Sequence, residues 1–484
     1  MPGSTRRSRI CRWEVAAVAG LVLVLAACGG SSSPGPTGAP GSPSPTPTAG
    51  DGRIPLIVDN DMSFDDVMAI AFLLNRPEVE LIGVTVTGTG IAHCGPGARN
   101  ARDLLHELGG PEVPTACGSE EPLGNGLPFP DPWRDGADDM FGLGIDGVPG
   151  TPKTTAVELL TELIRGSDRP VTILATGPFT NLAEALAADP GLADGIERLV
   201  IMGGAVDVDG NATEDGGAAP AEWNFAADPL AVEAVWEAGI PMVLVPLDAT
   251  NDVPITRAFV DELQRDSAAG TANLVEELLL RNALSIDVDY FWDVLAAMWL
   301  VKPEVVTTEE AGISIVPGGA EAGRSIRSDD GAMVTLATAA DREAFESTFL
   351  ETLRSGGQRR TPFELIGELT VRSDGTDCEA AVPAAPTAGS YALAFSNESA
   401  VDMAAVAIGL TEGSTWDDLD AWIADNPGSI DQPPMVVVNG VVLPAPGSTG
   451  SALVDLPPGD AALVCLVAAD DQQEVISGER FVVE

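Results

Sequence analysis

Basic residues are scarce in this sequence. Its 484 residues include 25 lysines and arginines against 73 aspartates and glutamates, which gives a formal net charge of −48 at pH 7. Nucleic acids and anionic membrane surfaces both repel a chain of this charge. The composition therefore argues against either as a partner, and we interpret the excess of acid as a solvated acidic surface.

Histidine is nearly absent. The two histidines are His93 and His106, and no C-x-x-C motif is present. Because zinc sites are built from these groups, the sequence disfavours a zinc site. His93 follows a predicted strand, and its role is left open between a structural and a catalytic one. His106 lies on a predicted helix, and no role is assigned to it.

Cysteine is also rare. Two of the six cysteines, Cys11 and Cys28, belong to the N-terminal region, and the other four fall as a near pair and a far pair. In an oxidising compartment the simplest pairing is one bridge per domain. The predicted disulfides are Cys94–Cys117 and Cys378–Cys465.

The N-terminal region has no apolar run long enough for a spanning helix, which needs about 20 residues. Four arginines precede the short apolar run "VAAVAGLVLVL", and "LAAC" ends at Cys28. This order resembles a bacterial lipoprotein signal, which implies cleavage after residues 1–27 and lipid on the Cys28 thiol. Residues 28–52 are rich in Pro, Ser, Gly and Thr, so they are predicted to be a disordered tether. The folded part is therefore expected outside the cytoplasm, anchored to the cell membrane by lipid.

Two folded domains are predicted after the tether. Residues 53–360 alternate apolar strands with helical patterns, which indicates an α/β domain with a mostly parallel, doubly wound sheet. Residues 365–484 are short β-rich runs broken by Gly, Pro and Ser, which indicates an all-β sandwich with one helical insert. The sandwich resembles cupredoxin-like or Ig-like domains. It contains no histidine, which a copper site needs. We therefore interpret it as a binding or spacer module whose partner is unknown.

The stretch "IVDNDMSFDDVMAIAFLL" concentrates acid at the end of the first predicted strand. It holds Asp59, Asp61, Asp65 and Asp66 within eight residues. An EF-hand loop is excluded, because Phe64 stands where such a loop needs glycine and a strand precedes it. Capping of the following helix accounts for one or two of the acids. Four acids together predict a metal or ligand site, since unpaired buried charge is costly.

"IVDNDMSFDD" resembles the D-x-D-x-x-x-D-D signature of the inosine–uridine-preferring nucleoside hydrolase family. Four further segments resemble the family in the same order: "ILATGPFTNLAEAL", "VIMGGAVDVDGN", "AEWNFAADPLAVEAV" and "YFWDVLAAMWLVKP". The resemblance covers residues 54–353. It implies a calcium-dependent hydrolase that cleaves the N-glycosidic bond of ribonucleosides and releases base and ribose.

The resemblance also implies roles for individual residues. Asp61 matches the general base that activates the attacking water, and Asp59 matches a supporting position. The implied calcium ligands are Asp61, Asp66, the Thr176 carbonyl and Asp293. The implied substrate-binding residues are Asp65, Asn211, Glu222 and Asn224. Two tryptophans outside the family pattern, Trp223 and Trp292, leave two interpretations open: they line an aromatic pocket that binds the base of the substrate, or they pack in the core.

Three departures from the family pattern affect this prediction. Trp292 stands where the family has a histidine that protonates the leaving base, and an indole is a poor proton donor. Another acid, or stacking on the base, would have to assist departure, or activity is weak. Thr89 replaces an asparagine, and the spacer between Asn211 and Glu222 is longer than usual.

Because of these departures, two alternative functions remain open. One is a non-catalytic lipoprotein that captures nucleosides or related ribosides through calcium. The other is a structural surface protein with a relic α/β domain. Base preference and homo-oligomer formation are not determined by the sequence.

Overall fold

The computed structural model describes residues 52–150, 154–213, 217–265, 267, 270–356, 363, 365–425, 433–469 and 472–484. The predicted leader, the predicted lipid site at Cys28 and nearly all of the predicted tether lie outside the described residues. In the described part of the chain, no helix is long and apolar enough to cross a membrane.

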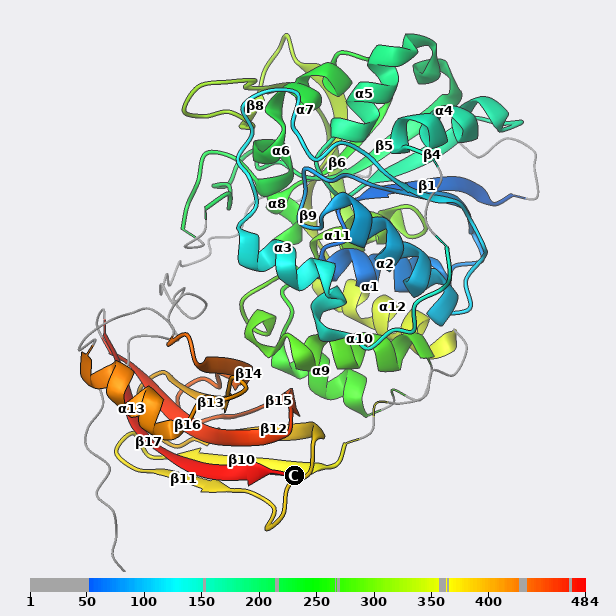
Figure 1. The fold of residues 1–484 in the computed structure, drawn as a ribbon. Coiled ribbons are helices and arrows are strands. Elements are labelled where there is room, and N and C mark those ends of the chain that lie inside the picture. The colour runs from blue at the N-terminus through cyan, green and yellow to red at the C-terminus, as the bar shows by residue number, and fades with distance from the viewer. Residues whose placement is uncertain are drawn as a thin grey trace, which may run out of the picture.

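A nine-stranded sheet with the order β3-β2-β1-β4-β5-β6-β9-β7-β8 organises the first domain (Figure 1). Its strands are β1 (Ile54–Asn60), β2 (Val79–Val86), β3 (Thr115–Cys117), β4 (Val171–Ala175), β5 (Ile196–Met202), β6 (Met242–Val245), β7 (Val306–Ile315), β8 (Ser325–Arg327) and β9 (Ala332–Ala340). All neighbours from β3 to β9 are parallel, and β7 pairs antiparallel with β8 and β9. The predicted α/β class with a mostly parallel sheet is confirmed. The antiparallel strands β7 and β8 were not predicted.

Helices cover both faces of this sheet because alternate strand residues point to opposite sides. Leu56 and Val58 of β1 pack into one core, and Ile57 between them packs into the other. Helices of the first core are α1 (Phe64–Leu73), α2 (Cys94–Glu107), α9 (Arg257–Gln264), α10 (Gly270–Arg281), α11 (Trp292–Trp299) and α12 (Arg342–Ser355). Helices of the second core are α4 (Ala156–Gly166), α5 (Thr180–Ala188) and α7 (Pro229–Trp236). Short helices α3 (Asp131–Asp138), α6 (Trp223–Ala227) and α8 (Leu247–Thr250) lie in the connections.

The C-terminal residues form two four-stranded sheets, β11-β10-β12-β15 and β14-β13-β16-β17. Their strands are β10 (Gly367–Ser373), β11 (Cys378–Ala381), β12 (Gly389–Asn397), β13 (Met403–Leu410), β14 (Val436–Val442), β15 (Thr449–Leu456), β16 (Gly459–Ala469) and β17 (Gln472–Val483). Helix α13 (Trp416–Asp425) is the predicted helical insert. The all-β fold class is confirmed, although β10 and β12 pair in parallel.

Both predicted disulfides are present. Cys94–Cys117 joins the start of α2 to β3, and Cys378–Cys465 joins β11 of one C-terminal sheet to β16 of the other. Closing a chain loop in this way stabilises a fold mainly by restricting its unfolded state.

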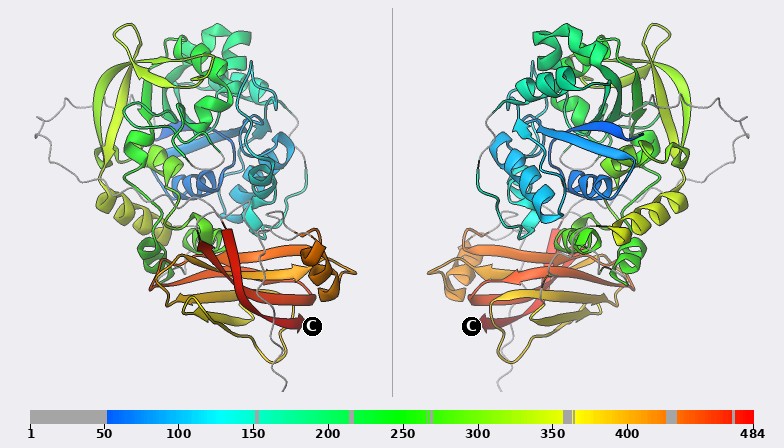
Figure 2. Two further views of the ribbon diagram at one scale, coloured as in Figure 1. Left: turned by 90° about the vertical axis from the view of Figure 1, so that its left-hand side faces the viewer. Right: turned by 90° about the vertical axis from the view of Figure 1, so that its right-hand side faces the viewer.

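The two β-sheets lie against the helical side of the first domain, below α9 and α10 in Figure 1 and again in both views of Figure 2. Arg281 at the end of α10 forms an ion pair with Asp455 of β15. The Arg257 guanidinium at the start of α9 donates a hydrogen bond to the Ser451 carbonyl over 3.4 Å. These contacts bring the added domain against the segment that leads into α11.

Candidate active site

The carboxyl ends of the central parallel strands meet at one edge of the sheet, where open α/β sheets bind their ligands. Asp61 follows β1, Thr87–Gly90 follows β2, Thr176 follows β4, and Gly203 follows β5. A backbone hydrogen bond joins the ends of β1 and β4, because the Thr176 N–H donates to the Asp59 carbonyl over 2.9 Å. The sheet therefore gathers the segments that follow four of its strands, and two of these segments hold the predicted site residues Asp61 and Thr176.

Asp61 is buried between two glycine-containing loops. A Cβ on Gly90 would lie 2.2 Å from the Asp61 Cβ, and one on Gly177 would lie 2.9 Å from it, so neither position leaves room for a side chain. The Ile91 N–H donates to Asp61 Oδ2 over 3.2 Å. Asp61 Oδ1 is buried and has no hydrogen-bond partner in the described structure. A buried acceptor without a partner is costly, which marks this oxygen as the place for a cation or a water proton.

The backbone turns sharply directly after Asp61. Met62 has φ +57°, in the left-handed region that non-glycine residues rarely adopt. Its N–H donates to Asn60 Oδ1 over 2.8 Å. Strain of this kind concentrates at functional sites. Here it lies in the short connection between the end of β1 and the start of α1, which carries Asp65 and Asp66.

Ser63 lies at the centre of the acid cluster. Its hydroxyl lies 2.6 Å from Asp65 Oδ1, 3.2 Å from Asp66 Oδ2 and 3.1 Å from Asp293 Oδ2. The Asp293 N–H also donates to Asp65 Oδ2 over 3.0 Å, which fixes the start of α11 against α1. Sequence reasoning did not select Ser63, and its position two residues after Asp61 was the only available signal.

Helix capping explains part of the cluster, as the sequence allowed. Ser63 and Asp66 form a reciprocal capping box at the start of α1. Asp66 is not only a cap, because its Oδ1 accepts a hydrogen bond from the Thr176 hydroxyl over 2.6 Å. The carboxylate of Asp66 therefore connects α1 to the end of β4.

Asp59 has a supporting role. Its Oδ1 accepts hydrogen bonds from the Thr85 hydroxyl over 2.7 Å and from the Asn181 amide over 2.8 Å. These donors come from β2 and α5, so Asp59 ties both neighbouring elements to β1. Burial raises the pKa of Asp59 to about 6.

Burial raises the pKa of every acid in the cluster, and repulsion by neighbouring carboxylates adds to the effect at Asp61, Asp66 and Asp293. Burial and then the charge of Asp66 raise the pKa of Asp61, and burial and then the charge of Asp65 raise the pKa of Asp293. Burial and the charge of Asp65 raise the pKa of Asp66 to about 6, and burial raises that of Asp65. A positive ion among these side chains would remove this penalty.

The donor set suits a hard cation. Asp61, Asp66 and Asp293 would supply carboxylate oxygens, and Thr176, whose hydroxyl donates to Asp66, would add its backbone carbonyl. Carboxylate and carbonyl oxygens are the ligands that Ca²⁺ takes. The carboxylates accept hydrogen bonds from protein groups, among them the Ser63 and Thr176 hydroxyls and the Ile91 N–H. Within the described ranges, no group of three or more His, Cys, Asp or Glu side chains is already arranged to hold a metal ion. The fit therefore rests on the type of donors and on the unpartnered Asp61 Oδ1.

Two of the predicted sugar-binding residues, Asn224 and Asn211, lie near the ends of β4 and β5. The Asn224 amide donates to the Met202 carbonyl over 3.3 Å and reaches the Thr176 carbonyl at 3.5 Å. Asn211 Oδ1 accepts a hydrogen bond from the Trp223 N–H over 3.2 Å, so the long spacer still brings Asn211 beside this segment.

Glu222 is deeply buried and caps α6. Its oxygens accept hydrogen bonds from the backbone N–H groups of Gly204 and Asn224, both over 2.9 Å. Burial raises the pKa of Glu222 to about 7. The structure therefore assigns Glu222 a local structural role in addition to the predicted contact with sugar.

Thr89, where the family has asparagine, belongs to a hydroxyl chain. Its oxygen lies 3.0 Å from the Thr87 hydroxyl and 2.8 Å from the Thr180 hydroxyl, and Thr180 donates to Asp228 over 2.8 Å. The side chain thus pairs with protein groups at the end of β2.

Trp292 begins α11, directly before Asp293. Its ring centroid lies 5.7 Å from that of Tyr290, and its buried indole N–H has no acceptor in the described structure. Asp289, three residues earlier, was missed by sequence reasoning. Burial raises the pKa of Asp289 to about 6, with the charge of Asp65 adding to the effect. An acid group therefore lies within electrostatic reach of the cluster, close to the position where the family histidine is absent.

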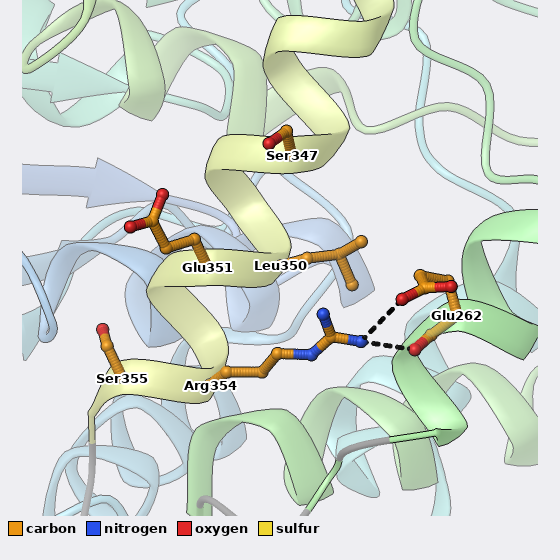
Figure 3. A pocket seen from close by; sticks show the side chains of 6 residues that line it. All are labelled: Glu262, Ser347, Leu350, Glu351, Arg354 and Ser355. Atoms are coloured by element: carbon orange, nitrogen blue, oxygen red, sulfur yellow. Dashed lines mark hydrogen bonds and ion pairs between the residues drawn. The ribbon is translucent and has the colours of Figure 1, made fainter.

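The surface groove between α9 and α12 is not part of this site. It encloses about 550 Å³ and is lined by Glu262, Ser347, Leu350, Glu351, Arg354 and Ser355 (Figure 3). The Arg354 guanidinium spans it to the Glu262 carbonyl and carboxylate. None of the lining residues belongs to the acid cluster, and an ion pair between Arg354 and Glu262 crosses the groove.

Comparison with known proteins agrees with this geometry. The family model described as inosine-uridine preferring nucleoside hydrolase matches residues 56–347, well over half of the chain. The chain belongs to this nucleoside hydrolase family. It is similar to the pyrimidine-specific ribonucleoside hydrolase RihA of Salmonella paratyphi C, with 35% identity over 282 residues that cover 55% of this chain and 85% of the relative. The RihA of Klebsiella pneumoniae is 34% identical over the same length.

Solved nucleoside hydrolase structures share the first domain. An inosine-uridine preferring nucleoside hydrolase from Bacillus anthracis superposes with a TM-score of 0.58 and 27% identity, covering 62% of this chain and 99% of that one. A purine-preferring ribonucleoside hydrolase from Gardnerella vaginalis gives 0.54 and 26%, covering 62% and 98%. The C-terminal sheets of this nucleoside hydrolase are therefore additional to the fold that these proteins share.

Membership makes the protein an N-glycosidic bond hydrolase whose substrate class is the ribonucleosides. The family depends on a metal ion, typically calcium.

Proposed function

We propose that this protein is a calcium-dependent ribonucleoside hydrolase in which Asp61 is the general base. The observation that carries the proposal is the buried cluster of Asp61, Asp65, Asp66 and Asp293, in which one oxygen of Asp61 has no partner among the described residues. Bound Ca²⁺ supplies charge that lowers the pKa of a coordinated water and orients it. Asp61, Asp66, Asp293 and the Thr176 carbonyl would hold the ion.

The protein groups then perform the reaction. Asp61 takes a proton from the attacking water while the bond between C1′ and the base nitrogen breaks. Positive charge develops on the ribosyl ring, as in other glycoside hydrolyses. The Asp65 carboxylate, with the amides of Asn211 and Asn224, fixes the sugar and stabilises that charge. Trp292 supplies an aromatic face for the base.

The direct test is ribose release from a panel of purine and pyrimidine ribonucleosides. We expect turnover of at least one of them in the presence of calcium. Because the relatives carry names with opposite base preferences, the panel must contain both kinds of base. Calcium and nucleoside binding without any ribose release would instead support the non-catalytic binding lipoprotein.

We infer that Asp289 is the acid that protonates the leaving base, since Trp292 cannot. A general acid must carry its proton, so kcat is expected to fall as the pH rises above about 6, the pKa of Asp289. Asp289→Asn should lower kcat on ribonucleosides by about 10²–10³-fold. It should leave cleavage of 4-nitrophenyl riboside nearly unchanged, because nitrophenolate departs without a proton.

Asp287→Asn is the matched control for this prediction. Asp287 lies on the same segment, is exposed, and has φ +65°, which asparagine also adopts. Equal losses on both substrate types in Asp289→Asn would contradict the inference, because they would indicate general damage to the site.

We also propose that the protein acts outside the cytoplasm, anchored by lipid on Cys28. The lipobox-like "LAAC" and the two disulfides support this proposal. Mass spectrometry of the protein from the membrane fraction tests it. A protein that remains soluble and unmodified at Cys28 would contradict it.

A further inference from the structure

Arg134 of α3 is a buried cation outside the acid cluster, with an exposed fraction of 9%. Its guanidinium donates to the Gly90 carbonyl over 2.6 Å and to the Gly88 carbonyl over 2.9 Å. These carbonyls belong to the loop that follows β2. A guanidinium is planar and carries several N–H donors in fixed directions, so it can donate to two carbonyls at once. A lysine ammonium has no such fixed arrangement of donors and is less suited to this role.

A second set of contacts fixes Arg134 itself. Its Nε donates to His93 Nε2 over 3.3 Å, and His93 Nδ1 lies 2.8 Å from Asp138 Oδ2. Asp138 Oδ1 accepts the His93 N–H over 2.8 Å. The histidine whose role the sequence left open therefore orients Arg134 and does not touch the acid cluster in the contacts described.

The loop held by Arg134 is the one that packs on Asp61. The Ile91 N–H donates to Asp61 Oδ2 over 3.2 Å, and the Ala92 N–H donates to the Asp61 carbonyl over 3.0 Å. Gly90 lies so close that an added Cβ would be 2.2 Å from the Asp61 Cβ. A small shift of this loop must therefore move Asp61 or break its hydrogen bonds.

We propose that Arg134 is a positioning residue for hydrolysis, which holds the loop from Gly88 to Ala92 in the place that orients Asp61. The proposal rests on the proposed function, because it takes Asp61 as the general base. Helix α3 also contacts the sugar side of the site, since the Trp133 ring centroid lies 5.3 Å from that of Trp223, next to Glu222. One short helix thus contacts both the loop after β2 and the start of α6.

The test compares three variants of the full-length protein. Arg134→Met should lower kcat by about 10²-fold, the effect of a shift of about 1 Å in a reacting group. Its KM should change by less than about threefold, because the sugar contacts remain. Arg134→Lys should recover part of the loss. Arg99→Met is the control, since Arg99 is exposed and donates to the Asp138 carbonyl but not to the loop.

Gly90→Ala gives a second route to the same result. It leaves Arg134 intact and pushes directly on Asp61, so it should reproduce the loss of kcat. This variant keeps the proposal testable if Arg134→Met unfolds because two buried carbonyls lose their donor.

Hydrogen exchange separates this proposal from the proposed function. The amides of Ile91 and Ala92 should lose protection in Arg134→Lys and Arg134→Met and keep it in Arg99→Met. Unchanged protection at both amides, or a kcat within about threefold of wild type in folded Arg134→Met, would overturn the proposal. If the wild type hydrolyses no ribonucleoside while these amides still depend on Arg134, the loop assignment stands and the hydrolase assignment fails.

Discussion

Asp61→Asn is expected to reduce ribose release by about 10³-fold or more, which combines the loss of a general base with a weakened metal site. Asparagine has the shape of aspartate and can still accept the Ile91 N–H. Asp61 itself lies buried among other acids, and its raised pKa reflects burial and the charge of Asp66. The substitution removes the negative charge of Asp61 and so relieves its repulsion with Asp66 in the metal-free protein.

The variant should therefore lose activity without losing its fold. We expect its melting temperature without metal to equal or exceed that of the wild type, while its calcium affinity falls. Initial rates, differential scanning calorimetry and calorimetric calcium titration measure the three quantities. A variant that keeps more than about a tenth of wild-type kcat would show that the general base is another group.

Removal of the metal is expected to abolish ribose release. With a chelator at pH 7.5, four buried carboxylates face one another without a cation, so the protein should also melt at a lower temperature. At calcium 100 times its Kd, binding to the folded state alone adds about 2.7 kcal/mol of stability. Added Ca²⁺ should restore both activity and melting temperature. Mg²⁺ should restore less, because it demands octahedral geometry and gives up its waters reluctantly.

The pH dependence of the chelated protein follows from the raised pKa values. Asp66 and Glu222 have pKa values of about 6 and 7 in the fold, above their ordinary 3.8 and 4.5. As the pH rises through this window, the unfolded chain releases protons that the folded chain retains. The contribution of these two groups to the free energy of unfolding is therefore fully present below about pH 4 and is lost as the pH rises toward 7. Each unit of difference corresponds to about 1.4 kcal/mol.

The chelated protein should therefore melt higher at pH 5 than at pH 7.5, and calcium should raise the melting temperature more at pH 7.5. Chelated protein of equal stability at both pH values would contradict the raised pKa values of the buried, metal-free cluster.

For the removal of the metal, full ribose release in the presence of a strong chelator would contradict the proposed calcium site.

The fold class was predictable because its signals are local. Apolar strands and amphipathic helices alternate in the sequence, and the periods of 2 and 3.6 residues reveal each element. Strands β7 and β8 were missed, because β7 has exposed residues at four of its ten positions and pairs antiparallel beside β9. Antiparallel pairing at the end of a parallel sheet depends on the neighbour, which a local pattern does not contain.

The acids of the site were predictable for a related reason. Asp61, Asp65 and Asp66 lie within six residues at the end of a strand, and such ends meet at one edge of a parallel sheet. Asp289 has no such signal. It becomes relevant because the fold places it within reach of the charge of Asp65, more than 200 residues away in the chain.

The sequence by itself determined the two kinds of fold and the concentration of acids after the first strand, since these follow from residue type and short-range spacing. It also determined the cysteine pairs, since one near pair and one far pair fall in separate predicted domains. Only the tertiary structure decided that Ser63 lies between carboxylates from α1 and α11, and that Arg134 and His93 hold the loop against Asp61. The physical reason is that such contacts join segments whose separation is set by packing of the whole core. No periodicity along the chain encodes which loop carbonyl a buried guanidinium will meet.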